Sequence, residues 1–393
     1  MSSSRNSQYV FAIFLFFYYG YLGLVSPFFS LYADHLGFTA IQISLVMSTP
    51  QITRILGPMF WGWLSDLRQD RIGIMRITSL VTLMIFLSIF YLQTFVGILL
   101  WMFLINIFSS SLTPLGEAAT VHSLQKTNRF ESHYGKIRLW GSIGFMIAVL
   151  LGGFWFESKG ITTLPWIGFA ILVCVTIAVW RLWEPPIEKQ QLTRGELRSI
   201  LKKPEVLWFF SSTFWMVFAH STLYVFYSLY LQQLGYGKQV IGFFWMIAVA
   251  AEVLYFYFQR HAFHQFKTDT ILRFTFVLGA ARFLVIAYFP SFWPLLIVQL
   301  FHAGTFAAHH SASIHMVQKW FKGTTQSRGQ ALYSTMSYGF GGTIGGVVAG
   351  WVWENYGPTI AFNVAVAACV FGYISISQST KFSKKAEITY PSN

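Results

Sequence analysis

The sequence predicts an all-α membrane protein with twelve transmembrane helices in two pseudo-symmetric halves of six helices each. Three observations lead to this fold class. Charged residues are scarce, apolar residues gather in runs long enough to cross a bilayer, and segments of the first half recur in the second.

The composition excludes a soluble globular chain. Of the 393 residues, 55% are hydrophobic, 19% are aromatic and only 10% are charged. A soluble domain carries about 25% charged residues. A disordered segment has few aromatic residues, so that class is excluded as well. The class that remains is a protein that spans a membrane.

Twelve runs along the chain are long and apolar enough to be spans, which need about 20 mostly apolar residues. The first run is too long for a signal-peptide core and no small-residue cleavage site follows it, so we expect it to be retained. The runs are residues 9–33, 41–64, 74–94, 96–121, 138–156, 162–183, 206–233, 239–259, 270–289, 291–317, 330–353 and 358–379.

The longest connection separates the first six runs from the last six. It runs from Glu184 to Pro204, has two prolines directly after Glu184 and is rich in charge (EPPIEKQQLTRGELRSILKKP). We therefore predict a first half at residues 1–184, a cytoplasmic linker at 185–204, and a second half with a short cytoplasmic tail at 205–393.

The net charge of +13 is explained by topology. If both termini are cytoplasmic, 23 of the 27 Lys and Arg residues fall in cytoplasmic loops, helix edges and tails, and only Lys159 and Lys238 fall on the opposite side. Cytoplasmic loops of membrane proteins carry such an excess of basic residues. We expect a multi-pass protein of the inner (plasma) membrane that binds no nucleic acid.

An internal repeat relates the two halves. FFSLYADHLGF (28–38) matches FYSLYLQQLGY (226–236) at an offset of 198, and FWFESKG (154–160) parallels WVWENYG (351–357) at an offset of 197. Two matches at nearly the same offset indicate a duplication. Transporters built from two such halves bind their substrate near the midplane.

Ionisable residues inside the predicted spans are the first candidates for function, because each costs about 2.5–3.5 kcal/mol to insert. Counted at about 1.5 Å per residue, Glu252, Arg282 and His310 all lie roughly 12–13 Å from the cytoplasmic side. This shared level predicts a proton-coupling cluster in which protonation of Glu252 releases Arg282. The alternative is a permanent Glu252–Arg282 ion pair that only fixes helix packing.

The tenth span carries a polar face. At 100° per residue, one arc of about 120° holds Gln299, His302, Thr305, Phe306 and His309, with His310 at its edge. This face is too polar for lipid, so we expect it to line a cavity. The histidines lack an acidic or thiolate partner at metal-ligand spacing on this helix, so we predict no metal site and no cofactor.

Candidates in the first half lie on the second and fourth spans. Asn106 and Glu117 share one helix face. Pro114 between them weakens the local backbone hydrogen bonding, so that carbonyl oxygens could face the cavity. Arg54 stands 198 residues before Glu252, so the two occupy equivalent places in the repeat. Arg54 would meet an anionic solute, or alternatively pair with carbonyls or with Glu117.

Two further patterns concern packing and the solute. His220, Tyr224 and Tyr227 follow i, i+4, i+7 spacing and would suit a planar organic solute. The glycines of YGFGGTIGGVVAG (338–350) allow close helix contact, either static or sliding during transport. We expect Gly57 and Gly62 of the second span to be their partners.

Several motifs resemble known transporter families. GWLSDLRQDR (62–71) resembles the gating-loop motif of the major facilitator superfamily, although the internal glycine is absent; the matching residues are Gly62, Asp66, Arg68 and Arg71. YGKIRLWGS (134–142), AEV (251–253) and QLFHAGTFAAHHSA (299–312) resemble the 3-phenylpropionic acid transporter family, a proton-symporter branch related to lactose and nucleoside permeases. The resemblance covers nearly the whole chain and implies the major facilitator fold.

The resemblance also implies roles for particular residues. The lactose-permease relatives carry an acid, an arginine and a histidine on the same three helices, which implies proton coupling by Glu252, Arg282 and His310, with His302 also in the matching motif. Glu117 and Arg138 are similar to the acid–arginine pair that binds sugar in those permeases. Here Arg138 sits nearer the cytoplasmic edge of its span.

The resulting prediction is a secondary active transporter, not an enzyme, that takes up a small organic solute with protons by alternating access. An aromatic acid, a sugar or a nucleoside would fit, and we expect a monomer in the bilayer. The sequence contains no P-loop, HExxH or nucleophile elbow. A proton-antiport exporter of drugs or metabolites with the same fold remains the alternative, and a solute sensor without net transport is a third.

Overall fold

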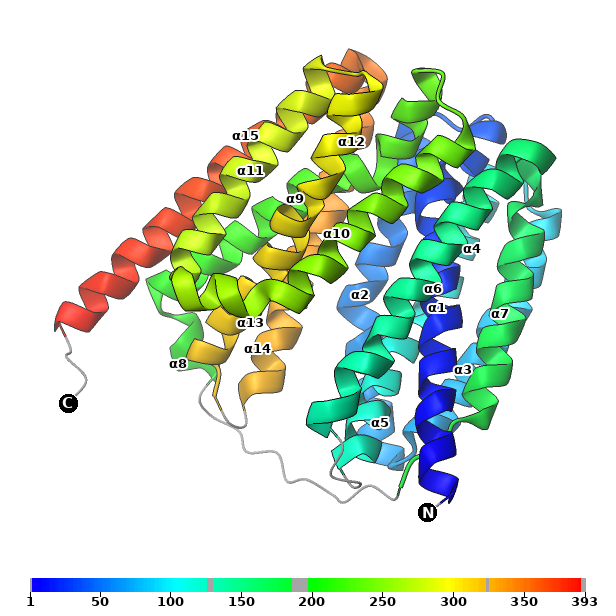
Figure 1. The fold of residues 1–393 in the computed structure, drawn as a ribbon, viewed down its shortest axis with the longest axis horizontal. Helices are drawn as coiled ribbons and strands as arrows, with labels where there is room; N and C mark the ends of the chain where they lie inside the picture. Colours follow the sequence, from blue (N-terminus) through cyan, green and yellow to red (C-terminus); the bar gives the residue numbers. More distant parts are fainter. Residues whose placement is uncertain (1, 126–129, 186–196, 323–324, 390–393) are drawn as a thin grey trace. The chain divides into compact units, whose positions relative to one another are not determined.

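The structure is a computed structural model, and it describes residues 2–125, 130–185, 197–322 and 325–389 (Figure 1). The described residues form helices and contain no β-strand. Most of the predicted linker, residues 186–196, lies outside the described residues. The predicted all-α fold class is confirmed.

The first six predicted spans correspond to observed helices, two of which are interrupted. In chain order the elements are α1 (Ser2–His35), α2 (Ala40–Arg68), α3 (Arg71–Phe86) with the 3₁₀ turn η1 (Leu87–Tyr91), α4 (Phe95–Ser109) with α5 (Leu112–Gln125), α6 (Phe130–Lys159), and the 3₁₀ turn η2 (Ile161–Thr163) with α7 (Leu164–Arg181).

The last six spans follow the short helix α8 (Leu197–Leu201). The tenth and eleventh spans each contain a π-helical turn, η3 and η5. The elements are α9 (Pro204–Gln233), α10 (Lys238–Gln265), α11 (Thr268–Tyr288), α12 (Phe292–Leu300) with η3 (Ala303–Ala308) and α13 (His309–Trp320), then α14 (Gln326–Ser334) with η5 (Thr335–Gly341), and α15 (Gly342–Thr389).

Helix lengths agree with twelve crossings. Nine segments of the described chain are long and apolar enough to span a membrane. One of them, Arg328–Lys385, contains two spans, because Gly357 takes a φ of 83° and is followed by Pro358. The more polar α2 and the interrupted α12–η3–α13 run complete the twelve predicted spans.

The predicted repeat recurs in the backbone. Gly37 and Gly235, 198 residues apart, both adopt left-handed φ angles of 81° and 85°, a conformation that favours glycine. Around each, the same three hydrogen bonds close the helix end: Leu36 N–H to Tyr32 O, Gly37 N–H to Asp34 O and Phe38 N–H to Ala33 O have counterparts at Leu234, Gly235 and Tyr236. The two halves therefore turn in the same way at matching positions.

The fourth span is broken between α4 and α5, just before Pro114. Proline lacks an N–H donor and its ring clashes with the carbonyl four residues earlier, which here is Ser110. The carbonyl of Ile107 accepts from the Trp61 indole at 2.7 Å and from the Ser110 hydroxyl at 2.7 Å. At Pro114 the predicted weakening is a full break of the helix. The Trp61 indole of α2 donates to the Ile107 carbonyl, which has lost its hydrogen bond within the helix.

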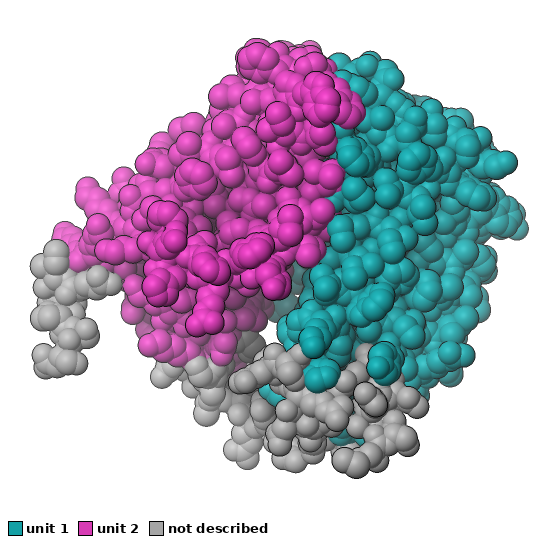
Figure 2. Space-filling model, in the orientation of Figure 1, with its two compact units in different colours: residues 1–190, 226–246 teal, residues 191–225, 247–393 magenta. Residues whose placement is uncertain are grey.

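The contacts divide the chain into two compact units, residues 1–190 with 226–246 and residues 191–225 with 247–393 (Figure 2). The predicted boundary at residues 185–204 remains a prediction, because the segment 226–246 packs with the first unit. There, Gln232 donates to the Asp34 carboxylate at 3.3 Å, and the Lys238 backbone N–H donates to the Glu157 carboxylate at 2.6 Å.

Small residues set the closest helix contacts within each unit. In the first unit, α1 packs along α6, and a Cβ on Gly144 would stand 2.0 Å from the Phe16 carbonyl oxygen. In the second, Cβ atoms on Gly341 and Gly345 would lie 2.5 Å and 2.6 Å from the Phe214 and Phe218 carbonyl oxygens of α9. The close partner of the predicted glycine motif is therefore α9.

The partners named from the sequence behave differently. A Cβ on Gly57 would meet the Ser110 hydroxyl at 1.9 Å, and one on Gly62 would meet nothing within 4 Å. The glycine-rich stretch and Gly57 thus make separate contacts, each within its own unit.

Candidate functional site

The second unit buries a connected set of polar side chains around Arg282 of α11. The guanidinium is 0% exposed. It donates through NH1 to His302 Nδ1 at 2.7 Å and to Thr305 Oγ1 at 3.2 Å, and through NH2 to Gln299 Oε1 at 3.1 Å. Burying this charge is tolerable only when its donors are met by acceptors. Three residues of the tenth span therefore hold the arginine.

His302 extends this set to a carboxylate. Its Nε2 lies 2.9 Å from Glu252 Oε1 of α10. Arginine has donors only, so His302 Nδ1 must accept, and the proton of a neutral His302 then sits on Nε2 and points at Glu252. The ordered link runs from Arg282 through His302 to Glu252.

Thr305 extends the set in the other direction, to His220 of α9. His220 Nδ1 lies 2.9 Å from the Met216 carbonyl, which can only accept, so Nδ1 carries the proton. His220 Nε2, 3.1 Å from Thr305 Oγ1, must then accept the hydroxyl proton. Thr305 thus accepts from Arg282 and donates to His220, and both nitrogens of His220 are engaged.

The position of Gln299 is fixed from both ends of its amide. Its Oε1 faces Arg282, and its Nε2 donates to the Leu295 carbonyl at 3.0 Å. The predicted face of the tenth span is therefore polar because it surrounds a buried guanidinium, with Gln299, His302 and Thr305 on it.

A small cavity of about 10 Å³, room for about one water molecule, adjoins this set within the second unit. His220, Tyr224 and Thr305 line it together with Phe306, His309 and Tyr333. Two of its walls come from π-helical turns, since Thr305 and Phe306 belong to η3 and Tyr338 belongs to η5. π-Helical turns occur frequently at functional sites.

The first unit holds a second polar set, on α1, α5 and α6. Arg138 Nε lies 3.4 Å from Glu117 Oε1, and the guanidinium carbon lies 4.4 Å from the centre of the Tyr19 ring. Both charged side chains are about one-third exposed. A Cβ on Gly141 would stand 2.8 Å from Tyr19 and 3.1 Å from Arg138 NH1, so this glycine leaves room for the stacked pair.

Arg54 and Asn106 complete the candidates of this unit. Arg54 is exposed and lies close enough to Tyr18 and Tyr19 to act on them electrostatically. Asn106 turns back on its own helix and donates to the Met102 carbonyl at 2.8 Å.

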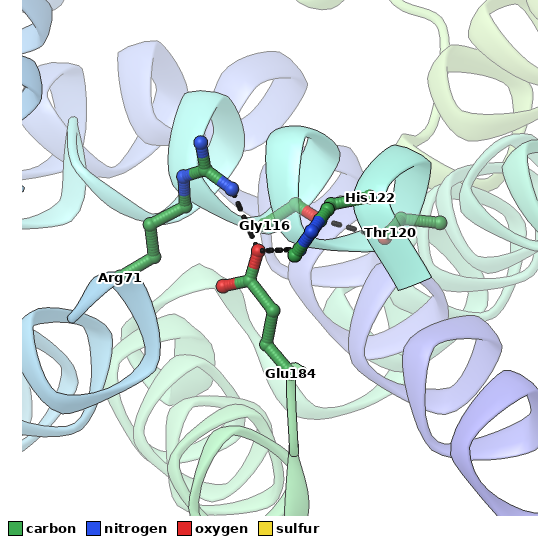
Figure 3. A network of polar contacts seen from close by, with 5 residues as sticks. All are labelled: Arg71, Gly116, Thr120, His122 and Glu184. Atoms are coloured by element: carbon green, nitrogen blue, oxygen red, sulfur yellow. Dashed lines mark hydrogen bonds and ion pairs between the residues drawn. The ribbon is translucent and has the colours of Figure 1, made fainter. Parts of the chain in front are cut away.

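A third polar set lies just after the end of α7 and contacts the start of α3 and the end of α5 (Figure 3). The Glu184 carboxylate, 4% exposed, receives Arg71 NH1 at 2.6 Å and His122 Nδ1 at 2.9 Å. Arg76 donates nearby to the Leu182 carbonyl at 2.9 Å. The first turn of α3 is thereby tied to the last residues before the linker.

A family model described as the MFS_1 like family matches residues 9–364. The chain belongs to this family. The match spans most of the chain, and it includes residues of all three polar sets. The protein is accordingly a membrane transporter of the major facilitator superfamily, as its helical spans also indicate.

Curated relatives and solved structures agree with this assignment. This MFS_1-like transporter is 26% identical over 356 residues to the probable 3-phenylpropionic acid transporter of Escherichia coli (strain K12), covering 90% of this chain and 93% of the relative. It is 23% identical to the maltose permease of Geobacillus stearothermophilus, with 88% of each chain covered. The predicted family resemblance is confirmed.

The fold is similar to that of the nucleoside transporter NupG, with a TM-score of 0.81 at 18% identity, covering 98% of this chain and 100% of the other. The POT family transporter PepTSo gives a TM-score of 0.77 at 11% identity. These likenesses show the major facilitator fold.

Not every predicted site residue of this MFS_1-like transporter joins the same set. Glu252, Arg282 and His302 come together, whereas His310 contacts the Tyr333 hydroxyl at 3.2 Å and stacks on Phe306. In the gating loop, Arg71 reaches Glu184, Arg68 is exposed, and the Asp66 side chain lies outside the described residues.

Sequence reasoning missed Glu184 and His122. Glu184 stands at the start of a charged, proline-rich stretch and reads as part of the linker. One signal in the sequence could have found them. The start of the third span, the end of the fourth and the end of the sixth are all predicted on the same side of the membrane. Among the described residues, no three His, Cys, Asp or Glu side chains are placed to hold a metal ion.

Proposed function

We propose that this transporter takes up a small organic solute together with protons, by alternating access. The observation that carries the proposal is the link from Glu252 through His302 to the buried guanidinium of Arg282. Glu252 is the group of this link that changes charge when a proton arrives, since arginine stays protonated in proteins.

Protonation of Glu252 has a definite electrostatic consequence. The carboxylate is joined to the Arg282 charge through one imidazole, and its neutralisation removes that counter-charge. An uncompensated buried charge is strongly destabilising. The protonated state therefore favours a rearrangement around Arg282, and return of the carboxylate restores the link. A proton is in this way coupled to a change of packing in the second unit.

The solute is proposed to be small, organic and at least partly aromatic or cyclic. The relatives are named for 3-phenylpropionic acid and maltose, and a structural neighbour is a nucleoside transporter. In the first unit, we propose that Glu117, Arg138, Arg54 and Asn106 contact the solute. In the second unit, we assign this role to His220, Tyr224, Gln299 and Thr305.

The orientation follows from the distribution of basic residues. We propose that both termini are cytoplasmic, that the membrane is the inner (plasma) membrane, and that the chain acts as a monomer without nucleic acid. The loop containing Gly62, Asp66, Arg68 and Arg71 then lies on the cytoplasmic side, where Arg71 and Glu184 form a gating contact.

Uptake by proteoliposomes that contain the purified chain tests this proposal. A panel of 3-phenylpropionate, maltose and uridine is offered with and without an imposed pH gradient. Symport predicts that an acidic exterior drives accumulation of at least one solute above its external concentration. Accumulation driven by an acidic interior would instead support the antiport exporter, and transport indifferent to the gradient would contradict proton coupling.

A further inference from the structure

The helix pair α3 and α7 of the first unit exposes aromatic rings at both of its ends. At one end, Trp166 is 66% exposed, and its ring centre lies 4.4 Å from that of Phe90. At the other end, Trp180 and Trp183 are exposed. Trp166 and Trp180 are 14 residues, or roughly 21 Å, apart along α7. Tryptophan gathers at the two surfaces of a membrane, so each end of this face lies near lipid headgroups.

Two arginines occupy the end that carries Trp180 and Trp183. Arg76 of α3 is partly exposed, donates through NH2 to the Leu182 carbonyl at 2.9 Å, and holds its guanidinium carbon 5.9 Å from the centre of the Trp180 ring. Arg181, the last residue of α7, is exposed. Arginine has five N–H donors, and one carbonyl accepts from only part of the Arg76 fork. Donors therefore remain at this end for a further acceptor.

The carboxylates near these arginines are engaged elsewhere. Glu184 is 4% exposed and already has two partners in the third polar set. Asp70 caps the start of α3 by accepting from the Gly73 backbone N–H at 2.7 Å. Among the described residues, no carboxylate forms an ion pair with Arg76 or Arg181. Their positive charge is thus available to a negatively charged group from outside the protein.

The surface that continues from Arg76 toward the opposite end of the pair is apolar. Ile77, Leu80 and Met84 of α3 are exposed, and at 100° per residue they share an arc of about 100° with Arg76. Ile177 of α7 is exposed as well. A hydrocarbon chain can lie along these side chains while its polar end stays beside the arginine.

We propose that Arg76, Arg181, Trp180 and Trp183 bind the headgroup of an anionic phospholipid. The paired N–H donors of a guanidinium match the oxygens of a phosphate. The exposed indoles carry N–H donors of their own, and amphipathic rings of this kind sit at headgroup level. A net negative headgroup fits best, because the ammonium of a zwitterionic lipid meets two arginines here and no unengaged carboxylate. The inference does not depend on which solute is transported.

The test is a titration of the purified full-length chain in detergent with dioleoyl phosphatidylglycerol or dioleoyl phosphatidylcholine, followed by native mass spectrometry. The two lipids share their acyl chains and differ in net charge. We expect the unmodified protein to bind phosphatidylglycerol roughly tenfold more tightly than phosphatidylcholine. The double variant Arg76→Gln/Arg181→Gln is expected to lose roughly tenfold in affinity for phosphatidylglycerol, with its affinity for phosphatidylcholine unchanged.

A charge-matched double variant provides the control. Arg260→Gln/Lys267→Gln removes the same charge from two exposed side chains where α10 meets α11 in the second unit. Its affinity for phosphatidylglycerol should equal that of the unmodified protein. Thermal unfolding checks that both double variants are folded. Should the first one not fold, Arg181→Gln alone, at an exposed position, carries the test against Arg260→Gln.

Equal affinity of the unmodified protein for the two lipids would overturn the inference. Unchanged affinity for phosphatidylglycerol in Arg76→Gln/Arg181→Gln, or in Arg181→Gln where that variant stands in, would do so as well. An equal loss in the control variant would show that net charge alone attracts the lipid, which also contradicts a site at α3 and α7. No solute or pH gradient is present, so failure here leaves the proposed uptake standing, and failure of uptake leaves the lipid site standing.

Discussion

His302 stands between Arg282 and Glu252, with its Nδ1 2.7 Å from the guanidinium and its Nε2 2.9 Å from the carboxylate. Because arginine can only donate, the imidazole has one orientation of its proton while the link is intact. A single side chain therefore lies between the Glu252 carboxylate and the buried cation, and each of its two contacts can be removed separately.

Two substitutions of His302 separate the two contacts. His302→Asn keeps an acceptor for Arg282 and loses the donor to Glu252, and His302→Gln does the opposite. We expect the Asn variant to keep most of its thermal stability but lose proton-driven accumulation. The Gln variant is expected to unfold at lower temperature, because the acceptor for a buried arginine donor is removed at a cost of roughly 1–3 kcal/mol. Equal thermal stability and full coupling in both variants would contradict the link.

The contact between Arg71 and Glu184 predicts a difference between two neighbouring arginines. Arg71→Gln removes the arginine partner of the Glu184 carboxylate, which is 4% exposed. We therefore expect destabilisation of roughly 1–3 kcal/mol and slower transport. Arg68→Gln is the matched control, since Arg68 is exposed, and its unfolding temperature should be unchanged. Equal effects of the two substitutions, measured by thermal unfolding and initial uptake rate, would show that the loop acts through net charge alone.

The close approach of α10 to α6 gives a steric prediction. A Cβ on Gly242 would lie 2.4 Å from the Val149 carbonyl oxygen and 3.3 Å from Gly153 Cα. We expect Gly242→Leu to lower stability by roughly 1–3 kcal/mol through overpacking, and to slow transport. Gly62→Ala should do neither, because nothing lies within 4 Å of its Cβ position. Wild-type uptake by Gly242→Leu would mean that this contact is not needed during the cycle.

Arg54 predicts a dependence on the charge of the solute. If its guanidinium meets an anionic group, Arg54→Gln should lower affinity for anionic solutes roughly tenfold and leave neutral ones unaffected. Competition by 3-phenylpropionate and by uridine for a bound solute provides the measurement. Equal losses for both compounds would assign Arg54 a structural role.

Much of the fold follows from local sequence properties. The spans could be predicted because apolar runs and basic loops are recognised from the sequence alone, without knowledge of how the helices pack. The turns at Gly37 and Gly235 could be matched because the left-handed conformation depends on the glycine itself. The break at Pro114 follows likewise from the missing N–H of one residue.

The membership of the polar sets could not be predicted in the same way. Counting residues gives the depth of a side chain but not the neighbour it faces. That count grouped His310 with Glu252 and Arg282, while the structure brings His302 to them. The π-helical turn η3 between His302 and His310 alters the regular rotation of 100° per residue on which the face was drawn. Glu184 was missed because its burial depends on residues of α3 and α5, far away in the sequence.

Glu252→Gln tests most directly whether protonation of Glu252 drives uptake. The amide imitates the protonated carboxyl and cannot release a proton. In proteoliposomes with an acidic exterior, we predict that this variant loses accumulation against a gradient while exchange of internal for external solute continues. Accumulation at the wild-type rate by Glu252→Gln would contradict proton coupling through Glu252 and remove this residue from the mechanism.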